Sequence, residues 1–252
     1  MNFPLKNLPE RTEKPRKNGL TMVMDKGMGL NGVKDFLSVA GPYIDIVKLG
    51  FGTSFVTENL QEKIDIYQNA GVPVYFGGTL FEAFLVRGQF DDYLKVIKDA
   101  NLSYVEVSDG SITIPHVEKC GYIEKLAGHV TVLSEVGSKD ATNIMPPYKW
   151  IELMRAELNA GSQYVIAEAR EAGNVGIYRD SGEVRQGLVQ EILTQIPSEK
   201  IIWEAPQKAQ QVYFLQLLGA NVNLGNLAPA EVLPLESMRY GLRGDTFHLF
   251  LK

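Results

Sequence analysis

Cysteine, net charge and long apolar runs are all scarce in this chain of 252 residues. Its one cysteine, Cys120, excludes an internal disulfide and a zinc cluster built from cysteines. No stretch of 18 apolar residues occurs, so no membrane-spanning helix is expected. The 30 acidic and 25 basic residues give a net charge of −5. The chain therefore has no overall excess of positive charge for binding nucleic acid or an anionic membrane. We therefore expect a cytoplasmic protein that binds neither nucleic acid nor membranes.

The N-terminus lacks the apolar core of a signal peptide. Residues 1–19 mix lysine, arginine and glutamate with three prolines, and we interpret them as a solvated lead-in. Apolar residues make up 45% of the chain and charged residues 22%, as in ordinary globular proteins. No change of composition interrupts the rest of the sequence, so we expect one domain over residues 20–252.

Short apolar runs alternate with helical patterns along the whole chain. The runs are rich in Val, Ile and Tyr, which is typical of parallel strands buried on both faces; they lie at residues 20–24, 44–49, 72–76, 104–107, 130–133, 164–167, 200–203 and 222–224. Between them, apolar residues recur at helical spacing, as at Leu60, Ile64 and Tyr67, with Gly71 as a stop. Eight such alternations in about 250 residues predict an α/β fold, a single (β/α)8 barrel. An open, doubly wound sheet is the alternative.

A glycine-rich segment after the first run matches the dinucleotide-binding pattern G-x-G-x-x-G at Gly27, Gly29 and Gly32. Two features argue against a nicotinamide cofactor. Asp25 and Lys26 separate the strand from the first glycine, and the acid expected at the end of the second strand is missing. We favour a βα loop whose backbone closely approaches an anion.

Polar groups recur at the C-terminal ends of the predicted strands. They are Asp25 and Lys26, Lys48, Gly77-Gly78-Thr79, Glu106 and Asp109, Glu135 and Lys139, Glu168 and Arg170, Glu204, and Gly225-Asn226. In a barrel these positions converge on one mouth, where barrel enzymes place their active sites. A salt-bridge network that closes the barrel is the plainer interpretation.

The chemistry of these groups indicates a metal and an anion. Clustered carboxylates need cations beside them, and carboxylate oxygens are ligands that Mg²⁺ accepts. No histidine stands at a strand end, which disfavours zinc. The glycine-rich ends of the third and eighth strands precede predicted helices, whose N-termini bind phosphate groups, although plain turns explain them as well.

Longer segments of the chain resemble the phosphosulfolactate synthase family (coenzyme M biosynthesis protein A family). These segments are 20–27 (LTMVMDKG), 47–54 (VKLGFGTS), 77–82 (GGTLFE), 105–111 (VEVSDGS), 135–139 (EVGSK), 168–171 (EARE), 204–208 (EAPQK) and 242–246 (LRGDT). The resemblance covers nearly the whole chain. It implies a (β/α)8 barrel, a homo-oligomer and a Mg²⁺-dependent carbon–sulfur lyase that adds sulfite to phosphoenolpyruvate, giving (2R)-phospho-3-sulfolactate. In methanogens that step opens coenzyme M synthesis.

Roles for individual residues follow from combining this reaction with the strand-end groups. Mg²⁺ is assigned to a subset of Glu106, Glu135 and Glu168, with Glu204 and Asp109 as further candidates. Lys139 is the expected proton donor to the α-carbon, with Lys48 as its rival. The groups expected to bind the anionic substrates are Lys48, Arg170, Lys26, Gly77, Gly78, Thr79, Gly225 and Asn226.

Two other functions stay open for a chain of this kind. The family resemblance extends to plant heat-stress-associated proteins, so a non-catalytic role in stress protection is one of them. Another enolase-like barrel lyase acting on a phosphorylated carboxylate is the other. All the strand-end charges are present here, which favours an enzyme.

Overall fold

The computed structural model describes residues 2–137, 145–170 and 172–251. Its strands are β1 (Thr21–Asp25), β2 (Ile46–Leu49), β3 (Val74–Phe76), β4 (Tyr104–Val107), β5 (Thr131–Val136), β6 (Ser162–Ala167), β7 (Ile201–Glu204) and β8 (Leu224–Leu227). The helices between and after them are α1 (Leu30–Ala40), α2 (Thr53–Val56), α3 (Leu60–Asn69), α4 (Gly78–Leu85), α5 (Phe90–Asp99), α6 (His116–Ala127), α7 (Pro147–Asn159), α8 (Gln186–Leu193), α9 (Lys208–Leu218) and α10 (Val232–Arg239). Three short 3₁₀ turns, Gly41–Tyr43, Ser198–Lys200 and Pro229–Glu231, join some of them.

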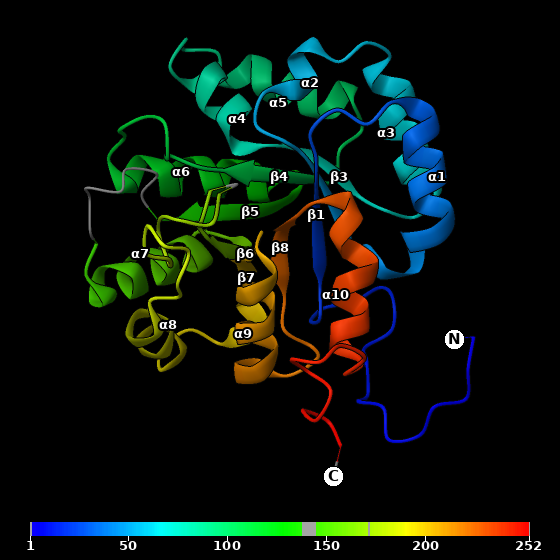
Figure 1. Ribbon diagram of the computed structural model, residues 1–252. Helices are drawn as coiled ribbons and strands as arrows, with labels where there is room; N and C mark the ends of the chain where they lie inside the picture. Colours follow the sequence, from blue (N-terminus) through cyan, green and yellow to red (C-terminus); the bar gives the residue numbers. More distant parts are fainter. Residues whose placement is uncertain (1, 138–144, 171, 252) are drawn as a thin grey trace.

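The strands form one parallel sheet in the order β3-β2-β1-β8-β7-β6-β5-β4. The first and last strands, β1 and β8, are paired in the middle of this order, and its two ends, β3 and β4, contact each other. Figure 1 shows the strands at the centre with the helices around them. The predicted (β/α)8 barrel is confirmed, and the open, doubly wound sheet is wrong, because the sheet curls until its edges meet.

The barrel interior is apolar at one end and charged at the other. Side chains inside the barrel include Ile46, Leu133 and Ile166, and each lies two residues before a charged side chain in the strand or directly after it. Successive side chains point to opposite faces of a strand, so a step of two residues keeps the same face. The residues that follow, Lys48, Glu135 and Glu168, therefore face inward at the C-terminal end.

Larger apolar clusters fill the space between the strands and the helices. One gathers residues from the first half of the chain, such as Val47, Tyr67 and Ile97, and another gathers residues from the second half, such as Trp150, Trp203 and Phe214. These layers fix the strands, and the strands fix the direction of the inward-facing charges.

The N-terminal segment packs against the opposite end of the barrel from these charges. Arg11 forms a buried ion pair with Glu236 of α10 (Nε–Oε1, 3.1 Å), and Arg16 pairs with Asp45 (Nη1–Oδ1, 3.1 Å). The interpretation of residues 1–19 as a solvated lead-in is therefore wrong for these two side chains, because buried carboxylates at the barrel base hold them in ion pairs. Nothing in the described part of the chain is a helix long and apolar enough to cross a membrane.

Candidate active site

A cavity of about 420 Å³ opens at the C-terminal ends of the strands. The residues that line it are Met24, Lys48, Phe51, Thr79, Glu106, Glu135, Glu168, Arg170, Ala172, Asn174, Glu204 and Asn226. Eight of the strand-end groups predicted from the sequence are thus brought together. They come from strands or loops at separate points of the chain, and the closure of the barrel makes them neighbours.

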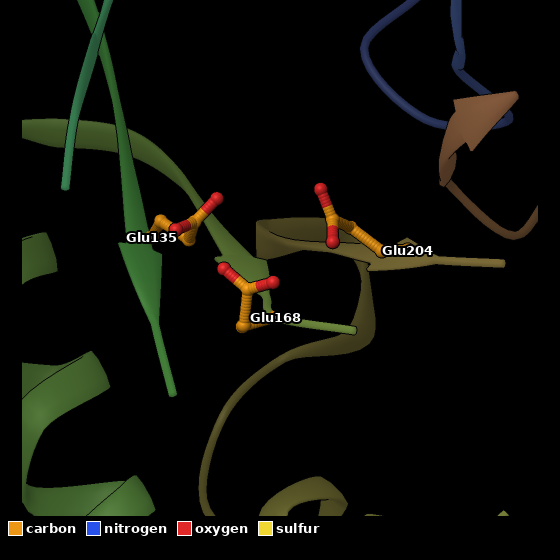
Figure 2. Close-up of side chains that lie close together, drawn as sticks. All are labelled: Glu135, Glu168 and Glu204. Atoms are coloured by element: carbon orange, nitrogen blue, oxygen red, sulfur yellow. The ribbon is translucent and has the colours of Figure 1, made fainter. Parts of the chain in front are cut away.

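Three glutamates from neighbouring strands form a compact group at the floor of this cavity. Glu135 belongs to β5, Glu168 follows β6 directly, and Glu204 ends β7. Figure 2 shows their carboxylates turned toward one another. All three side chains are buried, and one oxygen from each lies within 4.8 Å of the others.

Backbone N–H groups orient two of these carboxylates. Glu204 Oε2 accepts a hydrogen bond from the N–H of Ala169 (3.0 Å), and Glu168 Oε1 accepts one from the N–H of Arg170 (2.5 Å). Burial raises the pKa of Glu204 to about 7; Lys48 opposes this rise, and the Glu135 and Glu106 carboxylates add to it. Near pH 7 the protonated and ionised forms of Glu204 are therefore both populated.

Lys48 lies among the carboxylates as a fixed cation. Its Nζ is 2.9 Å from Glu106 Oε2, 3.7 Å from Glu135 Oε2 and 3.8 Å from Glu204 Oε1. Burial by itself lowers the pKa of this lysine, but the three glutamates outweigh burial and hold the pKa well above its usual value. A lysine that keeps its proton so firmly is suited to holding an anion and poorly suited to giving a proton up at neutral pH.

Glu106 is occupied on both of its oxygens. Oε1 accepts the backbone N–H of Gly78 at the start of α4 (2.7 Å), and Oε2 faces Lys48. A Cβ atom on Gly78 would lie 2.6 Å from Glu106 Oε1, so only glycine permits this approach. Glu106 therefore clamps Lys48 in place, and the N–H of Gly78 is directed at Glu106 and not at the cavity.

The rim of the cavity carries polar groups on tight backbone turns. Arg170 is exposed and has a φ of 56°, and Asn226 has a φ of 57°. Their loops are joined by a hydrogen bond from Asn226 Nδ2 to the carbonyl of Arg170 (3.0 Å). Left-handed backbone in residues other than glycine is uncommon and often accompanies binding sites. Arg170 thus supplies an exposed positive charge at the mouth.

Several predicted site residues lie away from the cavity. Asp109 forms an ion pair with Lys119 (Oδ1–Nζ, 2.9 Å). Lys26 is exposed in the loop after β1, and Gly77 is the N-cap of α4. Gly225 lies inside the barrel, where the Cε of Met22 is 2.6 Å from the position of a Cβ on that glycine. Lys139, the expected proton donor, lies outside the residues that the structure describes.

The glycine-rich loop after β1 does approach an anion, and that anion is its own Asp25. Asp25 Oδ1 accepts the N–H groups of Gly27 (2.8 Å) and Met28 (2.9 Å). Oδ2 is 2.7 Å from Lys63 Nζ and accepts a hydrogen bond from the Tyr67 hydroxyl (2.9 Å). These contacts account for both oxygens of the buried carboxylate, so it anchors the loop.

Four residues lining the cavity were not predicted as site residues. Met24 and Phe51 are apolar, and neither composition nor spacing marks them. Ala172 and Asn174 belong to the loop after β6, where a dense cluster of glycines already indicates close backbone contacts. Arg170, which lies in the same loop and was predicted as a site residue, is the feature of the sequence that could have drawn attention to them.

The donor set of the cavity fits a hard divalent cation. Glu135, Glu168 and Glu204 offer only carboxylate oxygens, and Mg²⁺ binds such oxygens at about 2.0–2.1 Å, which places its ligands about 3 to 4 Å apart. Four glutamates and two cations line the cavity among the described residues, an excess of two negative charges when all are ionised. A divalent cation cancels that excess and lets anionic ligands approach.

Comparison with known proteins supplies independent information. The family model described as (2R)-phospho-3-sulfolactate synthase (ComA) matches residues 9–245. The chain is 42% identical to the phosphosulfolactate synthase of Methanothermobacter thermautotrophicus over 94% of this chain and 95% of the relative. It is 40% identical to the Bacillus subtilis phosphosulfolactate synthase over 96% and 97% of the two chains.

Solved structures share the fold at low sequence identity. The crystal structure of 3-hexulose-6-phosphate synthase from Salmonella typhimurium superimposes with a TM-score of 0.52. It is 16% identical and is matched over 87% of this chain and 99% of that chain. Identity this low supports the barrel fold alone.

Proposed function

Because the chain belongs to the (2R)-phospho-3-sulfolactate synthase family, we propose that it catalyses the Mg²⁺-dependent addition of sulfite to phosphoenolpyruvate. The observation that carries this proposal is the cavity in which three buried glutamates and Lys48 share one space at the barrel mouth. The reaction joins two anions, and a divalent cation bound at such a site would cancel the excess negative charge and leave local cations to hold both anions.

The reaction makes one carbon–sulfur bond and one carbon–hydrogen bond. The sulfur lone pair of sulfite attacks the methylene carbon, and the double-bond electrons move toward the substrate carboxylate. A proton is then added to the α-carbon, and phosphosulfolactate is formed without loss of any group. The reaction belongs to the carbon–sulfur lyases when written in the reverse direction.

Glu135, Glu168 and Glu204 are the proposed metal ligands. A divalent cation held there supplies the charge that offsets the electrons gathering on the substrate carboxylate. Glu106 is excluded from this set, because the Gly78 N–H and Lys48 already occupy its two oxygens.

Lys48 and Arg170 are the proposed anion-binding groups. Lys48 is fixed at depth by Glu106, while Arg170 is exposed at the rim, so the two cations lie at different heights in the cavity. This arrangement suits a substrate with separated negative groups, such as phosphoenolpyruvate with its phosphate and carboxylate. Thr79 and Asn226 line the same space and can donate hydrogen bonds to it.

Lys139 stays the proposed proton donor. The raised pKa of Lys48 supports this choice, since it argues against the rival lysine. Lys139→Met is expected to lower kcat with a modest change in KM, whereas Lys48→Met also raises KM for an anionic substrate. Steady-state kinetics with both substrates varied measures the two patterns, and wild-type kcat in Lys139→Met contradicts the assignment.

The reaction is tested by incubating the protein with phosphoenolpyruvate, sulfite and Mg²⁺ and following the products by phosphorus NMR. We expect a new phosphate-ester signal that appears only with sulfite and disappears with excess chelator. Glu168→Gln is the matched variant, and it is expected to abolish the signal. Consumption of phosphoenolpyruvate without sulfite indicates a different lyase, and no consumption under any condition contradicts an enzymatic function.

A homo-oligomer is also proposed, on the basis of the family alone. Light scattering of the purified protein measures it directly. A mass near 28.0 kDa, that of one chain, over a wide concentration range contradicts it.

A further inference from the structure

Lys119 is a buried lysine that packs against the end of β5 and does not line the cavity. Lys119 lies in the first turn of α6 and is 1% exposed. Its Nζ donates to Asp109 Oδ1 (2.9 Å) and to the backbone carbonyl of Glu135 (2.6 Å), and it is 2.9 Å from Glu157 Oε1 of α7. Three acceptors match the three N–H bonds of an ammonium group. This lysine therefore joins the β4–α6 loop, α7 and the end of β5.

The contact with Glu135 replaces a missing strand partner. Successive carbonyls of a strand point to opposite sides, and the carbonyl of Val136 accepts the N–H of Glu168 on the β6 side. The carbonyl of Glu135 therefore points toward β4. The pairing of β4 with β5 ends at Val107, opposite Ser134, so β4 offers no ladder N–H at this point. The ammonium of Lys119 fills that place.

We propose that Lys119 is a positioning residue for the metal site: by holding the main chain of Glu135 beyond the last β4 pair, it fixes the direction of the Glu135 carboxylate. The proposal rests on the assignment of Glu135 as a metal ligand under the proposed function. Groups that orient a metal ligand commonly change metal affinity by 10- to 100-fold when they are removed. Lys119 acts through the backbone, so neither the metal nor a substrate needs to touch it.

Glu157 makes the inference testable without leaving a fully buried carboxylate unpaired, since Asp109, the other acidic partner of Lys119, is partly exposed. The Glu157 carboxylate is completely buried, and besides Lys119 it contacts His116 Nε2 (Oε1–Nε2, 3.1 Å). Removing Lys119 alone would leave this buried carboxylate without its lysine partner. The double variant Lys119→Met/Glu157→Gln removes both charges together. The single variant Glu157→Gln keeps Lys119 on Asp109 and on the carbonyl of Glu135, and serves as the matched control.

The readout is the dissociation constant for Mg²⁺ alone, measured by isothermal titration calorimetry on the full chain. We expect Lys119→Met/Glu157→Gln to bind Mg²⁺ at least tenfold more weakly than the wild type, and Glu157→Gln to bind within threefold of it. Lys119→Gln/Glu157→Gln is a more polar replacement with the same expected loss, for use if the methionine variant does not fold. Circular dichroism verifies the fold of each variant.

A buried ion pair at the other end of the barrel provides the structural control. Arg11→Met/Glu236→Gln removes charges that are buried to a similar extent, and it is expected to leave Mg²⁺ affinity unchanged. Wild-type affinity in a folded Lys119 variant overturns this inference alone. Equal loss in the Arg11/Glu236 variant overturns it too, because the effect is then one of general destabilisation. Absence of Mg²⁺ binding by the wild type overturns both this inference and the proposed metal site.

Discussion

The charged residues of the cavity interact with one another by attraction and by repulsion. Glu106 is paired with Lys48, and the other three glutamates stand close enough to repel one another unless a cation or a proton intervenes. For Glu204, burial is the main cause that raises its pKa to about 7, and the neighbouring Glu135 and Glu106 carboxylates add to the rise. The protonation of one carboxyl group and the binding of a metal are thus alternative ways to relieve the same repulsion.

Mg²⁺ affinity is therefore expected to depend on pH. A metal ion binds the deprotonated carboxylate, so below about pH 7 each ion that binds must displace the proton of Glu204. Affinity rises with pH up to about 7 and then levels off. Calorimetry near pH 6 in two buffers of different ionisation enthalpy measures the released protons. The same proton release in Glu204→Gln, which has no proton to lose, would contradict the assignment.

The metal-free protein is expected to show the linked effect on stability. The folded state keeps the Glu204 proton up to about pH 7, whereas the unfolded chain loses it near the ordinary value of 4.5. The stabilisation from this group is thus complete below about pH 4.5 and is lost as the pH rises through about 7. Urea unfolding across this range, with chelator present, should show a larger decline for the wild type than for Glu204→Gln.

At the scale of elements, the loop between β6 and α8 depends on the start of α9. Gln210 is buried, and its Nε2 donates to the carbonyls of Gly173 (2.8 Å) and Gly182 (3.1 Å). Its Oε1 accepts the N–H of Gln207, which completes a capping box at the helix N-terminus. One side chain thus caps α9 and holds the loop that brings Arg170 and Asn174 to the cavity.

Gln210→Leu is expected to lower the free energy of unfolding by about 1–3 kcal/mol, because buried carbonyls lose their donor. It should also raise KM for phosphoenolpyruvate, the proposed substrate, since the loop carries Arg170. Gln216→Leu is the matched control: Gln216 lies in the same helix, is exposed, and donates only to the carbonyl of Asp245 (3.3 Å). Urea unfolding and steady-state kinetics check both effects, and equal KM values for the two variants would argue against the loop as a support of the site.

At the scale of the whole molecule, the two ends of the barrel have separate tasks. The C-terminal end of the strands carries the cavity, and the opposite end is covered by the N-terminal segment, which lies beside α10 in Figure 1. Arg11 bonds Glu236, the side chain of Asn221 and the carbonyl of Ala220, so it ties the segment to two parts of the chain more than 200 residues away. This separation lets stability be changed at one end without altering the chemistry at the other.

Arg11→Met is expected to cost about 3 kcal/mol of unfolding free energy, at the lower end of the range for breaking a buried ion pair. Glu236 keeps Arg239 at 3.7 Å, which limits the loss. kcat and KM should stay unchanged, because the cavity is at the other end. Lys149→Met is the control, since its ion pair with Glu152 is exposed, and it should change stability by less than about 1 kcal/mol. Denaturant unfolding separates the two, and equal losses would contradict the structural role of Arg11.

The sequence by itself determined the alternation of strands and helices. Local periodicity encodes it, and the predicted run 104–107 coincides with β4, while the last predicted run, 222–224, shifted to Leu224–Leu227. The barrel mouth was predictable for the same reason, because a polar residue two positions after an apolar interior residue stays on the same face of its strand. Lys48, Glu106, Glu135, Glu168 and Glu204 are the side chains that this rule brought to the cavity.

Only the tertiary structure decided which of these groups are partners. The closure of the barrel placed Glu106 closest to Lys48, which also lies within 4 Å of Glu135 and Glu204. It also gathered Glu135, Glu168 and Glu204 into one group. It turned Asp109 away, because the chain leaves the sheet after Val107 and the aspartate meets Lys119. No local sequence pattern predicts the contact of Lys119 with the main chain of Glu135, since that contact depends on how α6 packs against β5. Contacts between residues far apart in the chain are set by packing, and spacing along the sequence carries no record of them.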